Sequence, residues 1–206
     1  MRTDDDGPPR RRSAAATRER ILSAANALFY AQGIRATSAD RVVEKAGITK
    51  VTFYRHFPTK SDLVVAYLTE QGAAERAWFT STRIAGDPVG SLHAIAAGIG
   101  SVSCSPGFRG CAFINAAAEF SDPDDPARVA VAAHRRWMLD EFTDIAAEAG
   151  AEDPQVVARQ LMMLRDGAMV NGYVGEPDEL GAALSSAFDA ALAAAISERP
   201  APAPTS

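Results

Sequence analysis

Apolar and polar residues between positions 37 and 60 (TSADRVVEKAGITKVTFYRHFPTK) are spaced as in two short helices joined by a tight turn. The first helix has an apolar stripe at helical spacing, formed by Val42, Val43 and Ala46. Ser38 precedes this stripe as a good N-cap, and Gly47 follows it where a helix ends in the left-handed conformation. The pattern predicts a helix bounded by Ser38 and Gly47.

A second helix is predicted from Thr49, another N-cap residue, to the proline at position 58. Phe53 and Phe57 stand one turn apart on one face, so we expect both to point into a small core. The opposite side carries the residues suited to base edges in a major groove, which are Lys50, Val51, Thr52, Tyr54 and Arg55. The two helices together predict a helix-turn-helix.

The rest of the chain is predicted to be helical, because no alternating strand pattern occurs in it. One helix is expected from Thr17 to Gly33, and a long helix from Lys60 to about Ile84 is expected to connect the helix-turn-helix with the C-terminal part of the chain. A short helix is expected at 111–120. Later helices begin at prolines that follow an acidic residue, namely Pro88, Pro126, Pro154 and Pro177.

Charge is distributed unevenly along the 206 residues. Residues 1–60 hold twelve Lys and Arg against six Asp and Glu, a net charge of +6, and the remainder holds nine against twenty, a net charge of −11. These two values give the net charge of −5 for the whole chain. A basic end that contains the helix-turn-helix, on an otherwise acidic chain, indicates a protein that meets phosphate with one end only.

The sequence around the second helix resembles the TetR family of transcriptional regulators. The resemblance rests on the AGIT turn, the K-x-T-x-Y-x-H-F run at 50–57 and a lysine that opens the next helix. A further segment, FRGCAFINAAAEF, looks like a stretch common in a TetR subgroup. The resemblance implies a homodimer that binds a palindromic double-stranded DNA operator and, as a repressor, is released by a small-molecule effector.

Family resemblance and side-chain reach together give the expected DNA-binding residues. Tyr54, His56 and Lys60 match family positions that contact phosphates, whereas Lys50 in the first turn suits base contact. The full expected set is Ser38, Thr49, Lys50, Val51, Thr52, Tyr54, Arg55, His56 and Lys60. Ala39 and Asp40 depart from relatives that place threonine or arginine there, and Asp40 would repel phosphate unless it is paired.

We expect an all-α fold with an N-terminal three-helix DNA-binding domain and a C-terminal helical domain for ligand binding and dimerisation. The expected parts are a disordered basic arm at 1–16, the helix-turn-helix domain at 17–60, the regulatory domain at 61–198 and a disordered tail at 199–206. The last two helices carry wide apolar stripes, including Val157, Leu161, Leu184 and Phe188. Resemblance to TetR proteins implies that these helices pair with their copies in a four-helix bundle, and the alternative is that they close the core of one protomer.

An effector pocket is hypothesised among aromatic and methionine side chains of the acidic part of the chain that follows residue 60. His134 is of particular interest because it lies on an otherwise inward face of its helix, and Asn171 continues the stripe that begins at Val157. The expected pocket residues are Trp78, Phe79, Phe113, His134, Trp137, Met138, Met162 and Asn171. Core packing is the alternative interpretation of each.

Other classes of function have weaker support. The chain contains none of the common catalytic or nucleotide-binding motifs, and its three histidines lack metal-ligand spacing, so we expect no enzyme, no metal and no cofactor, with a helical-bundle enzyme as a remote third alternative. Cys104 and Cys111 flank one loop and leave open a redox-sensing regulator, or are simply small buried side chains. Neither a signal peptide nor an apolar run of about 18 residues occurs, which predicts a cytoplasmic protein without a membrane partner.

Overall fold

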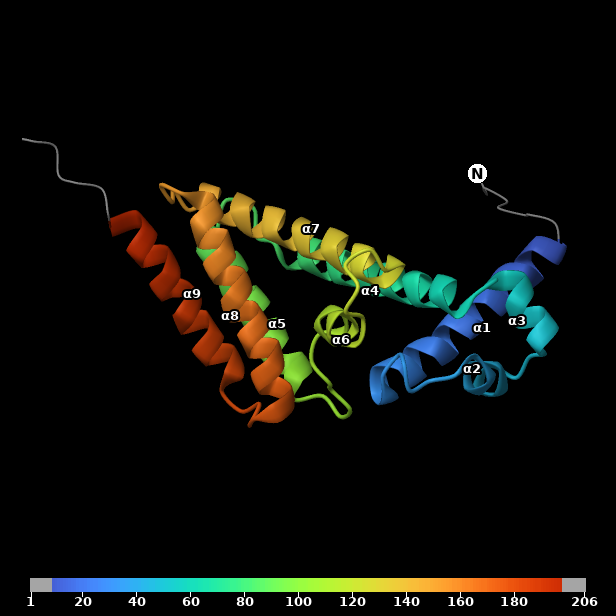
Figure 1. Cartoon of the computed structure of the whole chain (residues 1–206). Helices are drawn as coiled ribbons and strands as arrows, with labels where there is room; N and C mark the ends of the chain where they lie inside the picture. Colours follow the sequence, from blue (N-terminus) through green and yellow to red (C-terminus); the bar gives the residue numbers. More distant parts are fainter. Residues whose placement is uncertain (1–8, 198–206) are drawn as a thin grey trace, which may run out of the picture. The chain divides into compact units, whose positions relative to one another are not determined.

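The computed structural model describes residues 9–197, and all regular secondary structure among them is α-helical (Figure 1). This confirms the predicted fold class. The helices are α1 (Pro9–Gln32), α2 (Ala39–Ala46), α3 (Lys50–His56), α4 (Lys60–Thr82), α5 (Pro88–Ser103), α6 (Ala112–Glu119), α7 (Pro126–Glu148), α8 (Pro154–Val174) and α9 (Leu180–Ser197). Within this part of the chain, no helix is apolar and long enough to cross a membrane.

The described part of the chain divides into two compact units, one formed by residues 9–71 with 115–130 and the other by residues 72–114 with 131–197. The division therefore passes through α4 near Gly72, whereas the sequence placed a boundary after Lys60. Helix α6 is also shared, because its first three residues belong to the second unit and the rest to the first. Both α4 and α6 are thus continuous helices that run from one unit into the other.

The first unit is built around buried side chains of α1 to α4. Phe53 and Leu63 are fully buried, and the rings of Phe29 and Tyr67 meet edge to face with centroids 5.5 Å apart. Ser38 and Thr49 are the N-caps of α2 and α3, as predicted. Local capping chemistry therefore sets where each of the two short helices begins.

Helix α1 begins earlier than expected. The sequence predicted a disordered arm up to Ala16 and a cap at Thr17, but the helix starts at Pro9, and the Thr17 hydroxyl donates to the Ser13 carbonyl inside it. Proline is tolerated at the first helical position, and the arginines and alanines that follow are good helix formers, so nothing stops the helix there. Residues 1–8 of the predicted arm and the predicted tail at 199–206 lie outside the described part of the chain.

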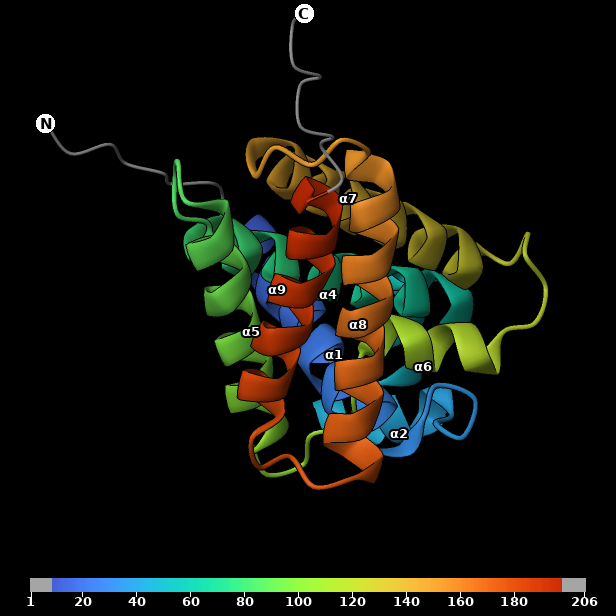
Figure 2. The same cartoon turned by 90° about the vertical axis from the view of Figure 1, so that its left-hand side faces the viewer.

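In the second unit, α5, α9 and α8 lie side by side (Figure 2). A Cβ atom added at Gly100 of α5 would lie 2.8 Å from the backbone of Gly181 of α9, so these two helices meet at a point where only glycine fits. The apolar stripes of the last two helices are buried between the helices of one protomer, including Val157, Leu161, Leu184 and Phe188. These particular stripes close the protomer core, and any partner must meet a different face.

Candidate DNA-binding surface and interior charged cluster

The helix-turn-helix presents the outer side of α3 to solvent. Gly47 has φ +61° and ψ +44°, the left-handed conformation predicted for it, and its N–H donates to the Glu44 carbonyl. Phe53 points inward and is fully buried, whereas Val51 and Tyr54 are 70% and 50% exposed. An apolar valine side chain with this exposure is free to meet a partner surface, such as the methyl group of a thymine.

Lys50 and Asp40 form an ion pair on this surface, with Nζ and Oδ2 2.8 Å apart and both side chains exposed. The hydrogen bond and the negative charge of Asp40 raise the pKa of Lys50. Asp40 was expected to repel phosphate unless it is paired, and its carboxylate is indeed paired. Lys50 is the residue expected to contact a base edge. To do so, its ammonium must either release Asp40 or contact Asp40 and the base at the same time.

Two other residues that are expected to contact DNA also cap the N-terminal ends of helices. Ser38 Oγ accepts the Arg41 N–H at 3.3 Å, and Thr49 Oγ1 accepts the Thr52 N–H at 3.2 Å. Thr52 is also bonded to Thr49 through the two hydroxyl groups, 2.9 Å apart. Arg55 is exposed and His56 is half-buried. The hydroxyl groups thus hold the two helices in shape, and phosphate contacts by them stay a prediction.

Lys60 makes a hydrogen bond within the protein that the sequence did not predict. Its Nζ donates to the Ile34 carbonyl at 2.7 Å, and burial lowers the pKa of Lys60. The carboxylate of Glu119, from α6, accepts the N–H groups of Ile34 and Arg35 at 2.9 Å and 2.6 Å. Sequence reasoning missed Glu119, because 84 and 85 residues separate it from its partners and no local pattern marks such a pair.

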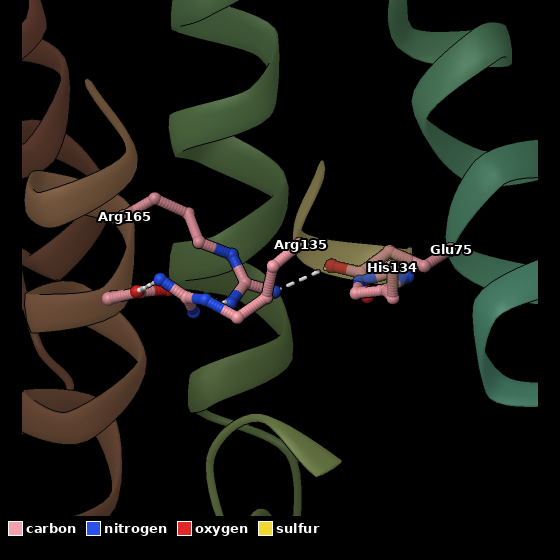
Figure 3. Close-up of polar contacts among 5 residues, drawn as sticks. Glu75, His134, Arg135 and Arg165 are labelled. Carbon is pink, nitrogen blue, oxygen red and sulfur yellow. Dashed lines mark hydrogen bonds and ion pairs between the residues drawn. The ribbon is translucent and has the colours of Figure 1, made fainter. Parts of the chain in front are cut away.

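A buried charged cluster occupies the second unit (Figure 3). Glu75 of α4 lies between two nitrogen-bearing side chains, with Arg165 Nη2 2.5 Å from its Oε1 and His134 Nε2 3.0 Å from its Oε2. Arg165 also contacts Asp166 at 3.2 Å, and Asp166 pairs with Arg135 at 2.7 Å. His134 and Arg165 are only 4% and 5% exposed, so other side chains replace water around these two residues.

Electrostatics favours the ionised forms of Glu75 and Arg165. Burial opposes the charge on Glu75, but the contact with His134 and the charge of Arg165 outweigh it and lower the pKa of Glu75. Burial likewise opposes the charge on Arg165, and neighbouring Cys111 and Glu75 outweigh it and raise the pKa of Arg165. The approach of His134 Nε2 to Glu75 lacks hydrogen-bond geometry, and His134 Nδ1 has no hydrogen-bond partner.

Most residues expected in the effector pocket do come together around this cluster. The His134 ring stacks on Phe113 with centroids 3.6 Å apart and planes 3° apart, and Trp137 follows at 5.3 Å. Phe79 meets Trp137 edge to face at 5.6 Å. Phe79, Phe113 and Met138 are at most 2% exposed, so their side chains fill the space that a ligand would take.

Of the other three expected pocket residues, Asn171 and Met162 lie elsewhere, and Trp78 meets Phe79 edge to face with ring centroids 6.3 Å apart. Asn171 is exposed on α8 and its amide donates to the Gly167 carbonyl of the same helix, so its assignment to an interior stripe is wrong. Trp78 packs on α5, where a Cβ added at Gly98 would lie 2.5 Å from its ring. Met162 lines an open groove of about 640 Å³ between α7 and α8. The other residues lining this groove are Arg135, Arg136, Leu139, Val156, Arg159, Gln160 and Met163.

The two cysteines are both free thiols in different settings. Cys104 is exposed, with its Sγ 3.9 Å from the Pro177 carbonyl oxygen, and Cys111 is buried. Burial of Cys111 agrees with a small core side chain, whereas the exposure of Cys104 does not. Oxidative pairing of the two stays a prediction.

An exposed α3 on a capped helix-turn-helix, joined to a second helical unit with a buried charged cluster, defines the class of DNA-binding regulators. A family described as "Bacterial regulatory proteins, tetR family" matches residues 21–67. The crystal structure of SCO4454, a TetR-family transcriptional regulator from Streptomyces coelicolor, is 40% identical, with a TM-score of 0.84 over 88% of this chain and 96% of that chain. The chain therefore belongs to the TetR family and is a DNA-binding transcriptional regulator rather than an enzyme.

Other relatives show the same likeness over different lengths. A putative TetR transcriptional regulator, sav143 from Streptomyces avermitilis, is 29% identical, with a TM-score of 0.75 over 85% of this chain and 97% of that chain. The HTH-type transcriptional regulator AcrR from Shigella flexneri is 36% identical over 84 residues, which is 40% of this chain and 39% of AcrR. The chain thus spans about two fifths of this curated relative.

Proposed function

We propose that this regulator is a homodimeric repressor that binds a palindromic operator and is released by a small apolar or amphipathic effector. The observation that carries the proposal is that one chain has both an exposed seven-residue recognition helix, α3, and an apolar stripe on α8 that is exposed to solvent. A seven-residue helix reads few base pairs by itself. Two copies related by a two-fold axis read both halves of a palindrome and multiply the contacts.

The dimer face is proposed to be the exposed side of α8 together with the outer side of α9. Six residues of α8 follow one another at spacings of four and three, as on one face of a helix, and form what we call the α8 stripe: Val156, Gln160, Met163, Gly167, Val170 and Val174. Met163 and Val174 are 65% and 70% exposed. Exposed alanines of α9, such as Ala182 and Ala190, permit close approach of a second copy.

DNA contact is proposed to divide between base reading and backbone anchoring. Lys50, with Val51 and Thr52 beside it, is assigned to base edges, and Tyr54 and His56 to phosphates. Lys60 is assigned a double role, since its ammonium already holds the Ile34 carbonyl and can reach phosphate only by sharing that bond. Base reading then rests on the start of α3.

Effector release is proposed to act on the stack of Phe113 and His134. His134 Nδ1 is a buried polar atom without a hydrogen-bond partner, which is a cost that a ligand with a complementary polar group would remove. Because the surrounding rings are closely packed, such a ligand has to displace side chains to enter. Entry would therefore change the packing at the junction of α4, α6 and α7 within the second unit.

Four measurements test the proposal. Light scattering on the purified chain should give twice the monomer mass of 21.7 kDa. Selection from random-sequence DNA should return a palindrome, and a reporter placed behind that palindrome should be silenced when the protein is present. For an effector found by thermal-shift screening, the dissociation constant should rise when operator is saturating, by the factor with which effector weakens DNA binding. Equal constants with and without operator would exclude a ligand-released repressor.

A further inference from the structure

The open groove between α7 and α8 gathers positive charge within the acidic part of the chain. Residues after position 60 have a net charge of −11 and include only nine basic residues. Three of these nine line this one groove of about 640 Å³, and no acidic residue lines it. We call it the arginine groove, after Arg135, Arg136 and Arg159.

Two of the three arginines are available to hold an anion. Arg135 is already paired with Asp166 at 2.7 Å. The side chains of Arg136 and Arg159 are exposed, and neither forms an ion pair or a hydrogen bond within the part of the chain that the structure describes. Arg136 belongs to α7 and Arg159 to α8, so each wall of the groove carries an unpaired cation. A guanidinium presents a planar fork of N–H donors that matches a carboxylate or a sulfonate.

Most of the other residues in the lining are apolar. Leu139 on α7 is half-buried, Met162 on α8 is 6% exposed, and the next residue, Met163, is 65% exposed. On each helix an unpaired arginine precedes the leucine or the first methionine by three residues, so the cation and the apolar group share one face. A simple anion such as phosphate would gain nothing from these apolar groups, whereas an anionic molecule with an apolar body would contact both kinds of side chain.

The size and place of the groove set it apart from the other surfaces of the second unit. Ligand pockets typically measure about 300–1,000 Å³, so the groove suits a small molecule. None of the aromatic residues stacked around His134 lines it. It shares Val156, Gln160 and Met163 with the α8 stripe, but its three arginines lie outside that stripe. The cations are therefore not simply part of the proposed dimer face.

We propose that the arginine groove binds an anionic amphiphile, which is a small molecule with an apolar body and a carboxylate, sulfonate or similar acidic group. The guanidinium groups of Arg136 and Arg159 hold the acidic group from the two walls, and the leucine and the two methionines contact the apolar body. Methionine side chains are flexible, so the groove accepts apolar bodies of different shape. The site is separate from the effector site proposed at the aromatic stack, and it requires neither an operator nor repression.

Fluorescence titration of the purified full chain tests the site with two probes. Anilinonaphthalene sulfonate is an anionic amphiphile, and phenylnaphthylamine has the same rings without the sulfonate. The wild-type chain should bind the sulfonate probe at least roughly tenfold more tightly than the uncharged probe, as expected for hydrogen bonds between charged groups. Added salt should weaken binding of the sulfonate probe and leave binding of the uncharged probe nearly unchanged.

Variants of the lining assign the binding to the groove. Arg136→Gln and Arg159→Gln should each weaken binding of the sulfonate probe roughly three- to tenfold and leave binding of the uncharged probe unchanged. Leu139→Gln should weaken binding of both probes, because it removes apolar contact. Arg76→Gln is the matched control, because it removes the same charge from an exposed arginine of the same unit that does not line the groove. Melting curves confirm that each variant is folded at the temperature of the titration.

The inference is overturned if the sulfonate probe does not bind or binds no more tightly than the uncharged probe. It is also overturned if Arg76→Gln weakens binding of the sulfonate probe as much as the two groove variants do, since the effect would then come from net charge alone. Loss of binding in Phe113→Leu, with none in Arg136→Gln or Arg159→Gln, would place the probe in the aromatic stack and likewise contradict the inference. These titrations contain no DNA, so their failure leaves the proposed repressor standing, and failure to select an operator leaves the groove site standing.

Discussion

At the scale of single residues, the pair formed by Lys50 and Asp40 controls how the start of α3 can meet DNA. Both side chains are exposed and their charged atoms are 2.8 Å apart, so water screens the pair and its contribution to stability is small. Its importance is for binding, since the lysine attracts DNA while the aspartate opposes it. The two residues therefore predict opposite effects of mutation.

Replacing Lys50 with alanine should weaken binding to the selected operator by about 1 to 3 kcal/mol and relax the preference at one position in each half-site. The physical reason is the loss of one donor to a base edge, while phosphate contacts stay. Fluorescence anisotropy on the operator and on single-base variants measures both effects. An equal loss on random DNA would show that Lys50 contacts phosphate instead.

Replacing Asp40 with asparagine should strengthen binding to all DNA sequences, because it removes a negative charge beside phosphate and frees the Lys50 ammonium. The plot of log affinity against log salt should become steeper by about one unit. Titrations at several salt concentrations measure the slope, with Glu70→Gln as a control that removes an exposed carboxylate from α4 instead. A slope unchanged from wild type would contradict the account.

At the scale of elements, α4 and α6 carry the charges that have to be satisfied inside the protein. Glu75 on α4 has its carboxylate in contact with His134 of α7 and Arg165 of α8, so one residue joins three helices of the second unit. Removing one partner from a buried ion pair leaves the other charge uncompensated, which costs far more than the pair itself contributes. Helix α4, which was expected to connect the helix-turn-helix with the C-terminal part of the chain, thus carries the residue on which the other helices converge.

Replacing Glu75 with glutamine should lower the free energy of unfolding by about 3 kcal/mol at pH 7, because Arg165 is left buried without a counter-charge. The pKa of Glu75 is lowered in the folded chain, so its charge stabilises the fold fully above the ordinary value of 4.5 and this stabilisation is lost as pH falls through the folded-state pKa. The difference between wild type and variant should therefore shrink below pH 4.5. Urea unfolding at a series of pH values measures it, and a constant difference would contradict the role of the charge.

At the scale of the whole molecule, the α8 stripe is the feature that a single chain leaves unexplained. Its apolar members lie in a line on the outside of α8, and Gly167 in the middle has open space where a side chain would stand. A second copy would remove this apolar surface from water. Dimerisation then becomes a condition for tight operator binding, because both half-sites must be held at once.

Replacing Met163 with lysine should split the dimer, since two ammonium groups would be buried close together at the interface. Light scattering at micromolar concentration should show the monomer mass, and operator binding should fall to the level of a single half-site. Val129→Lys is the matched control, because it places the same charge on an exposed valine of α7 that is not part of the α8 stripe. A dimer that persists in Met163→Lys would place the interface elsewhere.

Short-range chemistry explains why the sequence by itself determined so much of the helix-turn-helix. Ser38, Gly47 and Thr49 act on backbone groups within a few residues, so their roles could be predicted from sequence and the structure confirms them. The all-helical fold followed from the spacing of apolar residues in the same way. The prediction of a helix start at Thr17 was wrong, because α1 begins upstream of Thr17 and the Thr17 hydroxyl bonds within the helix instead of capping it.

Only the tertiary structure decided which side of α8 is inside and which distant residues meet. Both sides of that helix are apolar, so the pattern could not choose between the face with Val157 and Leu161, which is buried, and the face with Met163, which is exposed. Glu119 and Ile34 are 85 residues apart, and Glu75 and Arg165 are 90 apart. Such pairs depend on how whole helices pack, a property that no local pattern of residues encodes.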